Sequence, residues 1–388
     1  MAGTESSATG RYLVLLEDDS TVVGARELTR LAGIRTVNTA DIVGASAAEL
    51  LGAADGVVLN ELGIALITAG ADQATALSEA VNAPGPIAAF EAERTVYAIG
   101  DQPAAPVDGE FTWGLQATRA DRSAATGKGV RVAVLDTGLD LQHPDLAGRD
   151  IVTGSFVPGE EVQDGHGHGT HVIGTSCGPR TSQNGPGYGI ASEASIYAGK
   201  VLGNEGSGSD SGILEGISWA ISNGCSVVSM SLGAATEPGQ PFSEAFERVA
   251  QRAMAKGTLI IAAAGNESAR GQGTVAPVGH PANCPSIMAV GAVDAQGAIA
   301  DFSCGTVDEI GQVDVVGPGV DVHSSWPGAG YKTLSGTSMA TPHVAGIAAL
   351  LAQQTPERAW GLWARLAQTA RRVPLPSTDA GAGLVQAP

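Results

Sequence analysis

Residues 336–346 read Gly-Thr-Ser-Met-Ala-Thr-Pro-His-Val-Ala-Gly and place Ser338 at the start of a helix made of small and apolar residues. Gly336 predicts a tight turn before the serine, and we place Pro342 in the first helical turn, where a missing N–H has no acceptor. A helix N-terminus offers unpaired N–H groups to a developing oxyanion. The segment predicts a nucleophilic serine; a buried Ala-rich helix capped by Ser or Thr is the alternative.

A serine hydroxyl needs a base, normally histidine, and the histidine needs an anion that holds its tautomer. Residues 129–138, Gly-Val-Arg-Val-Ala-Val-Leu-Asp-Thr-Gly, predict a buried strand that carries Asp136 to the C-terminal edge of a parallel sheet. Residues 164–174, Asp-Gly-His-Gly-His-Gly-Thr-His-Val-Ile-Gly, predict a glycine-rich loop followed by a helix. Asp136 and His168 therefore lie on different elements that can meet in space.

Four segments together carry a specific resemblance. Residues 134–138, 168–172 and 336–343 resemble the three signature segments of subtilisin-like serine proteases, in that family's chain order. Residues 262–267, Ala-Ala-Ala-Gly-Asn-Glu, resemble the segment with the family's side-chain oxyanion donor. The resemblance runs from about Trp113 to Val385 and implies an α/β fold, a parallel sheet flanked by helices, over residues 112–388.

The resemblance also implies roles for individual residues. Asp136 orients the imidazole, and His168 acts as general base and then general acid. Ser338 attacks the scissile carbonyl, and Asn266 holds the oxyanion together with the N–H of Ser338.

Two further histidines, His166 and His171, flank His168. His168 is assigned as the base because it begins the His-Gly-Thr-His pattern, and we expect the other two to be structural. A zinc site made by the three is disfavoured, because neither a His-Glu-x-x-His helix nor a cysteine pair accompanies them.

Two segments resemble the edges that bind substrate in this family. A peptide lying between them as an added β-strand is recognised through its main chain, which implies broad sequence tolerance. The residues that the resemblance places on these edges are Ser231, Leu232 and Gly233 on one side and Gly206, Ser207 and Gly208 on the other.

Small residues surround the expected site for the side chain before the scissile bond. Ala264, Gly265 and Gly279 imply an unfilled subsite that takes a large apolar side chain. For Gly279, plain turn geometry is an alternative explanation. Asp210 stands where relatives often carry an aromatic or apolar residue, so the resemblance leaves the preference at that farther subsite open.

The N-terminal region predicts a separate small domain. Strands are expected at residues 11–16, 56–60, 64–67 and 87–93, with one helix at 20–32 and a second capped by Asp72. The order β-α-β-β-α-β is that of a ferredoxin-like α+β unit. It is similar to the propeptide of secreted subtilisins, an intramolecular chaperone and inhibitor; an unrelated small domain is the alternative.

These patterns divide the chain into four parts. We expect a disordered N-terminus at residues 1–10, the inhibitor-like domain at 11–99, a linker at 100–111 and the catalytic domain at 112–388. The resemblance to the propeptides of this family implies self-cleavage near Ile99, between about Tyr97 and Ala105.

Composition limits the partners. A formal net charge of −19 over 388 residues argues against nucleic acid and anionic membrane surfaces, because both would repel the protein. No run approaches the roughly 18 apolar residues that span a bilayer. We expect a monomer whose partners are protein and peptide substrates and its own propeptide.

A structural calcium ion is implied by the resemblance, and no organic cofactor is expected. Residues 143–146, His-Pro-Asp-Leu, resemble the segment that supplies a carboxylate, here Asp145, to a calcium site. Further oxygen ligands are expected near Asn184 and at Gln102. A solvated turn aspartate is the alternative for Asp145.

Four cysteines allow three full pairings. The resemblance to the family implies that Cys284 and Cys304 lie on neighbouring loops and could bridge outside a cell, whereas Cys177 and Cys225 resemble buried small hydrophobes.

Residues 1–20 contain no signal peptide, so we expect a secreted protein whose signal is absent from this chain, with a cytoplasmic enzyme as the alternative. The predicted function is a serine endopeptidase made as a self-cleaving zymogen. A peptide ligase or macrocyclase on the same scaffold and an inactive peptide-binding protein are the alternatives.

Overall fold

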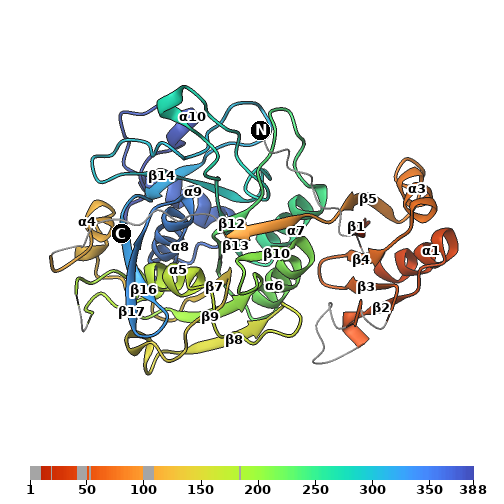
Figure 1. The fold of residues 1–388 in the computed structure, drawn as a ribbon, viewed down its shortest axis with the longest axis horizontal. Helices are drawn as coiled ribbons and strands as arrows, with labels where there is room; N and C mark the ends of the chain where they lie inside the picture. The colour runs from red at the N-terminus through yellow and green to blue at the C-terminus, as the bar shows by residue number, and fades with distance from the viewer. Residues whose placement is uncertain (1–9, 19, 42–49, 52–53, 99–108, 183–184) are drawn as a thin grey trace.

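The chain forms a large α/β unit and a small α+β unit that lie side by side (Figure 1). The computed structural model describes residues 10–18, 20–41, 50–51, 54–98, 109–182 and 185–388. The expected N-terminal tail, most of the expected linker and Ile99 lie outside the described residues.

The large unit is organised around a seven-stranded parallel sheet with the order β15-β14-β13-β11-β7-β9-β8. Most of its strands are short runs of buried apolar residues, the pattern of a sheet that is covered on both faces. The strands are β7 (Arg131–Asp136), β8 (Ile151–Ser155), β9 (Ser195–Lys200), β11 (Val227–Met230), β13 (Leu259–Ala263), β14 (Met288–Val293) and β15 (Val315–Pro318). The predicted α/β class is confirmed.

Helices cover both faces of this sheet. Alternate residues of β7 enter different cores: Val132 and Val134 pack with α5 and α8, whereas Ala133 and Leu135 pack with α6 and α7. The helices are α4 (Trp113–Ala117), α5 (His168–Cys177), α6 (Asp210–Ser222), α7 (Glu244–Ala255), α8 (Thr337–Gln354), α9 (Trp360–Thr369) and α10 (Ser377–Ala380), with short 3₁₀ turns η2 (Ala120–Arg122), η3 (Pro144–Leu146) and η4 (Arg270–Gln272). A hairpin of β16 (Val322–Trp326) and β17 (Gly330–Leu334) lies beside α5.

The small unit is a five-stranded sheet with the order β2-β3-β4-β1-β5. Its elements are β1 (Arg11–Leu16), α1 (Thr21–Ala32), β2 (Thr36–Asn38), η1 (Thr39–Asp41), β3 (Gly56–Leu59), β4 (Ile64–Thr68), α3 (Ala71–Ala80) and β5 (Ile87–Ala92). The predicted β-α-β-β-α-β order is present, with β1 antiparallel to both β4 and β5. The additional strand β2, parallel to β3, was not predicted.

The predicted cap of the second helix of this unit is wrong. Gly70 occupies the N-cap in an extended conformation, and its N–H donates to the side chain of Gln73 at 2.9 Å. Asp72 therefore lies inside the first turn, where its charge suits the helix dipole but caps nothing.

The two units share one hydrophobic core. Leu13, Leu15 and Leu66 of the small sheet belong to the same cluster as Phe246 and Val249 of α7. The other face of the small sheet is covered by α1 and α3. The small unit is thus packed against the helical face of the large one.

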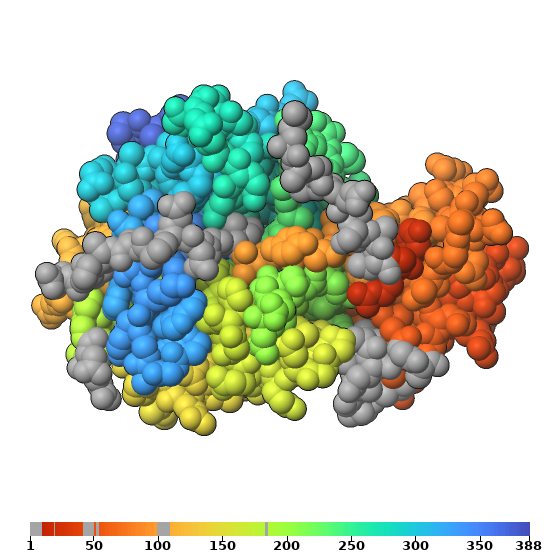
Figure 2. Space-filling view, viewed as in Figure 1, coloured from red at the N-terminus to blue at the C-terminus, as the bar shows by residue number. Residues whose placement is uncertain are grey.

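A last strand of the small unit crosses into the large one. β6 (Thr95–Ala98) is the middle strand of a three-stranded antiparallel sheet, between β10 (Ser207–Ser209) and β12 (Leu232–Gly233). In Figure 2 this orange stretch lies across the face of the large unit, with atoms of the large unit above and below it.

All four cysteines are buried free thiols, so the bridge that Cys284 and Cys304 could form is not made in this structure. Cys284 contacts the carbonyl of Ser243, whereas Cys304 contacts the carboxylate of Glu267 at 3.1 Å. The predicted burial of Cys177 and Cys225 is confirmed. Among the described helices, none is both long and apolar enough to cross a membrane.

Candidate active site

The site begins with a buried acid–base pair at the C-terminal end of the sheet. Asp136 is the last residue of β7 and His168 the first residue of α5, and they are 0% and 1% exposed. Nδ1 of His168 lies 2.7 Å from Oδ1 of Asp136, which also accepts the N–H of Thr137 at 2.8 Å. An ionised carboxylate only accepts hydrogen bonds, so Nδ1 carries the proton and Nε2 is the basic nitrogen.

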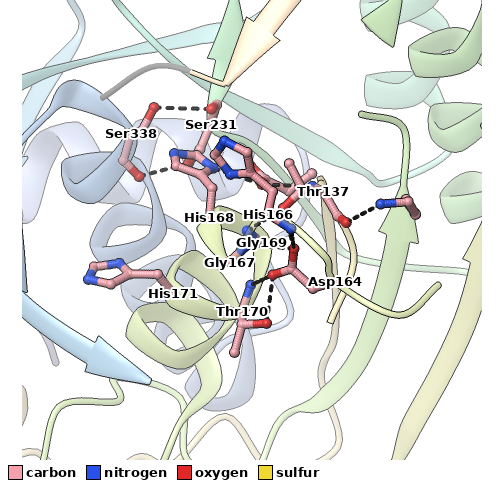
Figure 3. A network of polar contacts seen from close by, with 12 residues as sticks. Thr137, Asp164, His166, Gly167, His168, Gly169, Thr170, His171, Ser231 and Ser338 are labelled. Carbon is pink, nitrogen blue, oxygen red and sulfur yellow. Dashed lines mark hydrogen bonds and ion pairs between the residues drawn. The ribbon is translucent and has the colours of Figure 1, made fainter. Parts of the chain in front are cut away.

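A second carboxylate, Asp164, holds the start of α5 in place (Figure 3). Its Oδ1 accepts the hydroxyl of Thr137 at 2.9 Å and the N–H of Gly167 at 2.7 Å. Its Oδ2 accepts the N–H and the hydroxyl of Thr170, at 2.8 and 2.7 Å. Asp164 thus ties the helix that carries His168 to the end of the strand that carries Asp136.

Ser338 is the second residue of α8 and is completely buried. Its hydroxyl donates to the carbonyl of Ser231 at 3.0 Å. The hydroxyl of Ser231 in turn donates to the carbonyl of Ser338 at 2.8 Å (Figure 3). The nucleophile candidate is therefore fixed to the segment that leads into β12.

Two predictions about the start of α8 are wrong. Pro342 lies inside the helix, beyond its first turn, and its missing N–H would have bonded to the carbonyl of Ser338. The Ser231 hydroxyl satisfies that carbonyl instead, which explains why the proline is tolerated. Gly336 is extended, with φ 164°, so no turn requires a glycine there.

Asn266 follows β13 and faces the start of α8. Its Oδ1 accepts both the N–H and the hydroxyl of Thr337, each at 2.9 Å. Because Thr337 occupies the oxygen end of the amide, the NH₂ end is the one available to donate to a substrate.

The two flanking histidines have different surroundings. His171 is buried on α5, and its Nε2 contacts the carbonyls of Val322 and Lys332, both at 3.1 Å. Burial, with a smaller effect of His168, lowers the pKa of His171 to about 3, so this ring stays neutral and joins α5 to the β16–β17 hairpin. His166 is half-buried, with its ring 6.3 Å from that of His168.

The predicted substrate-binding edges lie on both sides of β6. Ser207 and Gly208 pair with Tyr97 and Val96, and the carbonyl of Gly206 accepts the N–H of Ala98 at 2.8 Å. On the other side, Leu232 pairs with Ala98 and Gly233 with Tyr97. The chain of the small unit therefore occupies the position in which the sequence places a substrate.

The small residues near this position are required by packing. A Cβ on Gly279 would lie 2.8 Å from the carbonyl oxygen of Ala234, and the N–H of Gly279 donates to Ala264 at 2.9 Å. Gly265 has φ +113°, and a Cβ there would meet Glu267 and Cys304. Simple turn geometry is therefore not the reason for Gly279.

The family model of the subtilases matches residues 127–383, more than half of the chain, including the elements that carry Asp136, His168 and Ser338. The chain belongs to the subtilase family. As a subtilase it is a serine endopeptidase with an α/β fold.

Three relatives illustrate the similarity. The subtilase is 42% identical over 279 residues to M-protease of Shouchella clausii, covering 70% of this chain and 68% of that protein. It is 45% identical over 249 residues to Subtilisin Savinase of Lederbergia lenta, with coverages of 63% and 85%. It is 46% identical over 233 residues to Subtilisin E of Bacillus subtilis, with coverages of 60% and 57%.

One oxygen of Asp145, the predicted calcium ligand of this subtilase that lies among the described residues, is taken up by hydroxyl donors. Oδ2 of Asp145 accepts hydroxyl donors from Tyr188 and Tyr331, both at 2.8 Å, and from Ser182 at 3.3 Å. Burial is the main cause that raises the pKa of both tyrosines, so the phenols keep the protons that they donate. Calcium needs six to eight oxygen ligands with lone pairs facing the ion.

The rest of the described chain offers no other metal centre. No group of three or more His, Cys, Asp or Glu side chains among the described residues could hold an ion, and this includes the three neighbouring histidines. The other two predicted ligands, Gln102 and Asn184, lie outside the described residues.

Sequence reasoning missed two residues that support the subtilase site. Lys200 is fully buried, and its Nζ donates to the carbonyl of Thr137 at 2.6 Å and pairs with Glu160 at 3.2 Å. Asp164 was quoted in a motif but given no role. An aspartate shortly before the start of a helix is a capping signal, and this signal could have identified Asp164. The sequence around Lys200 contains no pattern that indicates a role for this lysine.

Proposed function

We propose that this subtilase is made as a self-cleaving zymogen whose triad is Asp136, His168 and Ser338. The observation that carries the proposal is β6, which enters the site as a substrate strand. Ala98 pairs with Leu232, the neighbour of Ser231, and Ser231 exchanges hydrogen bonds with Ser338 in both directions. The last described residue of the small unit therefore stands next to the segment that holds the nucleophile, and we place the cleaved bond after Ile99.

The proposed chemistry follows from the hydrogen bonds of the site. The Ser338 hydroxyl must leave the carbonyl of Ser231 and give its proton to Nε2 of His168 as the oxygen attacks the scissile carbonyl. Asp136 keeps the imidazole in the required tautomer and stabilises the imidazolium. His168 then protonates the leaving amine, and water releases the acyl group by the same steps; this sequence needs no organic cofactor.

The negative charge on the tetrahedral intermediate would be held by two donors. One is the NH₂ group of Asn266, whose oxygen end is fixed by Thr337. The other is the N–H of Ser338 at the start of α8, where the helix dipole adds partial positive charge.

We propose broad specificity with a large apolar side chain before the cleaved bond. Pairing through the main chain on both edges supports the tolerance. The apolar preference rests on the resemblance alone, because the space that a Cβ on Gly265 or Gly279 would enter is filled by the chain's own atoms.

We propose that residues 11–99 are the propeptide and act as an inhibitor in place. Besides β6, two glutamates of the small unit bind the starts of helices in the large one. Glu93 accepts the N–H of Ser211 at 3.2 Å, and Glu91 accepts that of Ala245 at 3.1 Å. Carboxylates at helix N-termini are stabilising, so the contact favours the folded catalytic unit.

The test is intact mass over time for the purified chain and its Ser338→Ala variant, followed by a casein assay. At 38.8 kDa for 388 residues, cleavage near Ile99 gives fragments of about 10 and 29 kDa. Only the wild type should split and then digest casein. Splitting of the Ser338→Ala variant, or full activity without splitting, would overturn the zymogen proposal.

Peptide ligation or macrocyclisation is the alternative reaction, and the masses of the peptide products distinguish it from hydrolysis.

Export, a monomeric state and the lack of nucleic-acid or membrane partners stay predictions. The free state of all four cysteines lends no support to export.

A further inference from the structure

A second buried carboxylate of the large unit faces the chain of the small one. Asp210 is the first residue of α6, and its side chain is 0% exposed. Its Oδ2 accepts the N–H of Arg94 at 3.0 Å and lies 3.6 Å from a guanidinium nitrogen of the same arginine. One carboxylate oxygen thus contacts both the main chain and the side chain of Arg94.

This contact continues the strand pairing of β6 by one residue. Thr95 pairs with Ser209, and in the next position the N–H of Asp210 donates to the carbonyl of Arg94 at 3.2 Å. Both main-chain polar groups of Arg94 are therefore bound by Asp210. The binding edge of the large unit extends beyond β10 to the start of α6.

A histidine fixes this carboxylate in position. Nε2 of His280 lies 2.9 Å from Oδ1 of Asp210, and the His280 ring packs edge-on against Phe246 with centroids 4.7 Å apart. His280 is itself 2% exposed, so the pair has little freedom to move. With Oδ1 held, Oδ2 is the oxygen presented to the bound chain.

The Arg94 side chain lies between two carboxylates. Its guanidinium is 3.4 Å from Glu91 and 3.6 Å from Asp210, and the side chain is 26% exposed. Glu91 belongs to the small unit, so this carboxylate is absent when a separate peptide substrate occupies the site. Asp210 is the carboxylate that the catalytic unit itself supplies to a cation at this position.

We propose that Asp210 forms a distal substrate subsite, which binds the main-chain N–H of the sixth residue before the cleaved bond and favours a basic side chain there. The inference rests on the proposed function, since Arg94 is the sixth residue only if the bond after Ile99 is cut. Proline at this position is disfavoured because it has no N–H to donate. The preference for a cation weakens with salt, because the arginine is partly exposed.

The test uses the matured enzyme and internally quenched peptides that carry residues 95–99 of this chain before the bond. The sixth position is varied as Arg, Gln, Glu or Pro, and kcat/KM is measured at low and high salt. We expect Arg to exceed Gln by roughly three- to tenfold at low salt, with Glu and Pro below Gln. Equal values for Arg and Gln at low salt would overturn the proposal.

Two variants sharpen the result. Asp210→Asn keeps an acceptor oxygen but loses the charge, so Arg and Gln become equal while Pro stays poor. Glu205→Gln removes the same charge from an exposed position close to β10 and keeps the preference for Arg. An Asp210→Asn enzyme that still prefers Arg would contradict the assignment.

A peptide that spans only residues 96–99 before the bond separates this inference from the proposed function. It does not reach Asp210, so the wild type and Asp210→Asn should cleave it equally. If the wild type fails to cleave it, the proposed protease site itself is wrong. If the wild type cleaves it but shows no preference at the sixth position, only the distal subsite is wrong.

Discussion

Two buried histidine–carboxylate pairs with similar separations lie in the same unit, one through Nδ1 of His168 and the other through Nε2 of His280. His168 and Asp136 are 2.7 Å apart, and His280 and Asp210 are 2.9 Å apart. The side chains of all four residues are 2% exposed or less. The first pair adjoins the segment of Ser338, whereas the second faces the main chain of the small unit.

The comparison teaches that such a pair is not itself a catalyst. In the first pair, Asp136 holds the ring of His168 in one orientation. In the second pair, the ring of His280 holds the carboxylate of Asp210 in one orientation. We propose that the role depends on the group at the other end of the pair: a hydroxyl that His168 deprotonates, or the N–H of Arg94 that Asp210 binds. Substitutions at matched positions separate these roles.

The largest difference is expected between the two histidines. His168→Gln and Ser338→Ala should each lower turnover about 10⁶-fold, the loss measured for the corresponding residues of subtilisin, a member of the same family. The side chain of His280 contacts no reacting atom, so His280→Gln should lower turnover on a short peptide by less than about tenfold. Equal losses for His168→Gln and His280→Gln would break the comparison.

The two aspartates should differ almost as much. Asp136→Asn disturbs the tautomer of His168 and should lower kcat by about 10⁴-fold, the size known for this change in serine proteases. Asp210→Asn should leave kcat on a short peptide within about twofold, because no reacting group touches it. The measurement is kcat for both variants on the peptide that spans residues 96–99.

A smaller effect on turnover is expected at Asn266, the proposed oxyanion donor. Asn266→Ala should lower kcat about 10²- to 10³-fold, as measured for this role in subtilisin, with little change in KM. Thr337→Val keeps the N–H but removes the hydroxyl that holds Asn266, and it should cost about tenfold. A loss for Asn266→Ala as large as that for Ser338→Ala would contradict the assigned role.

Buried histidines without a carboxylate partner should make the folded protein less stable as the pH falls. A histidine whose charged form is stabilised by a partner would have the opposite effect. Burial lowers the pKa of His343 to about 4 and that of His171 to about 3. Between these values and about 6.5 the unfolded chain binds more protons than the folded one, so the free energy of unfolding falls as the pH falls through this window.

The check is urea unfolding from pH 7 to pH 4 in the Ser338→Ala background, which prevents self-digestion. His343→Gln removes one such proton and should reduce the slope by about 1.4 kcal/mol per pH unit. Unchanged slopes would show that the ring is protonated, or exposed, in the folded protein.

The smallest effect is expected at Asp145, a carboxylate bound by hydroxyls instead of an imidazole. Tyr331→Phe removes one of these hydrogen bonds and should lower the free energy of unfolding by about 1 kcal/mol. Because three hydroxyls already bind Oδ2 of Asp145, we expect that a chelator does not shift the thermal midpoint of wild type at this site. A midpoint that falls with chelator and recovers with calcium would show that an ion binds after all.

The sequence predicts those parts of the site that depend on local patterns. Strand β7 is a β-branched run that ends in Asp136, and the apolar residues of α8 follow Ser338, so short segments suffice to place both residues. The order of elements in the small unit is predicted for the same reason.

The parts that were missed depend on contacts between distant segments. Lys200 supports Thr137 from another strand, and the tolerance of Pro342 depends on the hydroxyl of Ser231. Cys284 and Cys304 stay apart because each packs against its own partner, Ser243 and Glu267. No local pattern reports such tertiary contacts.

The small unit contacts the large one through the shared core and β6, and also through polar contacts such as the ion pair of Asp18 with Arg252. If the chain is cut beyond Ala98, as we propose, the core contact and the strand make the cleaved fragment a bivalent ligand. The docked core keeps the strand at a high effective concentration over the site, even after the strand has dissociated. On this proposal, free peptides would compete poorly until the core contact opens, and the onset of activity would depend on the survival of the cleaved fragment and not on the cut itself.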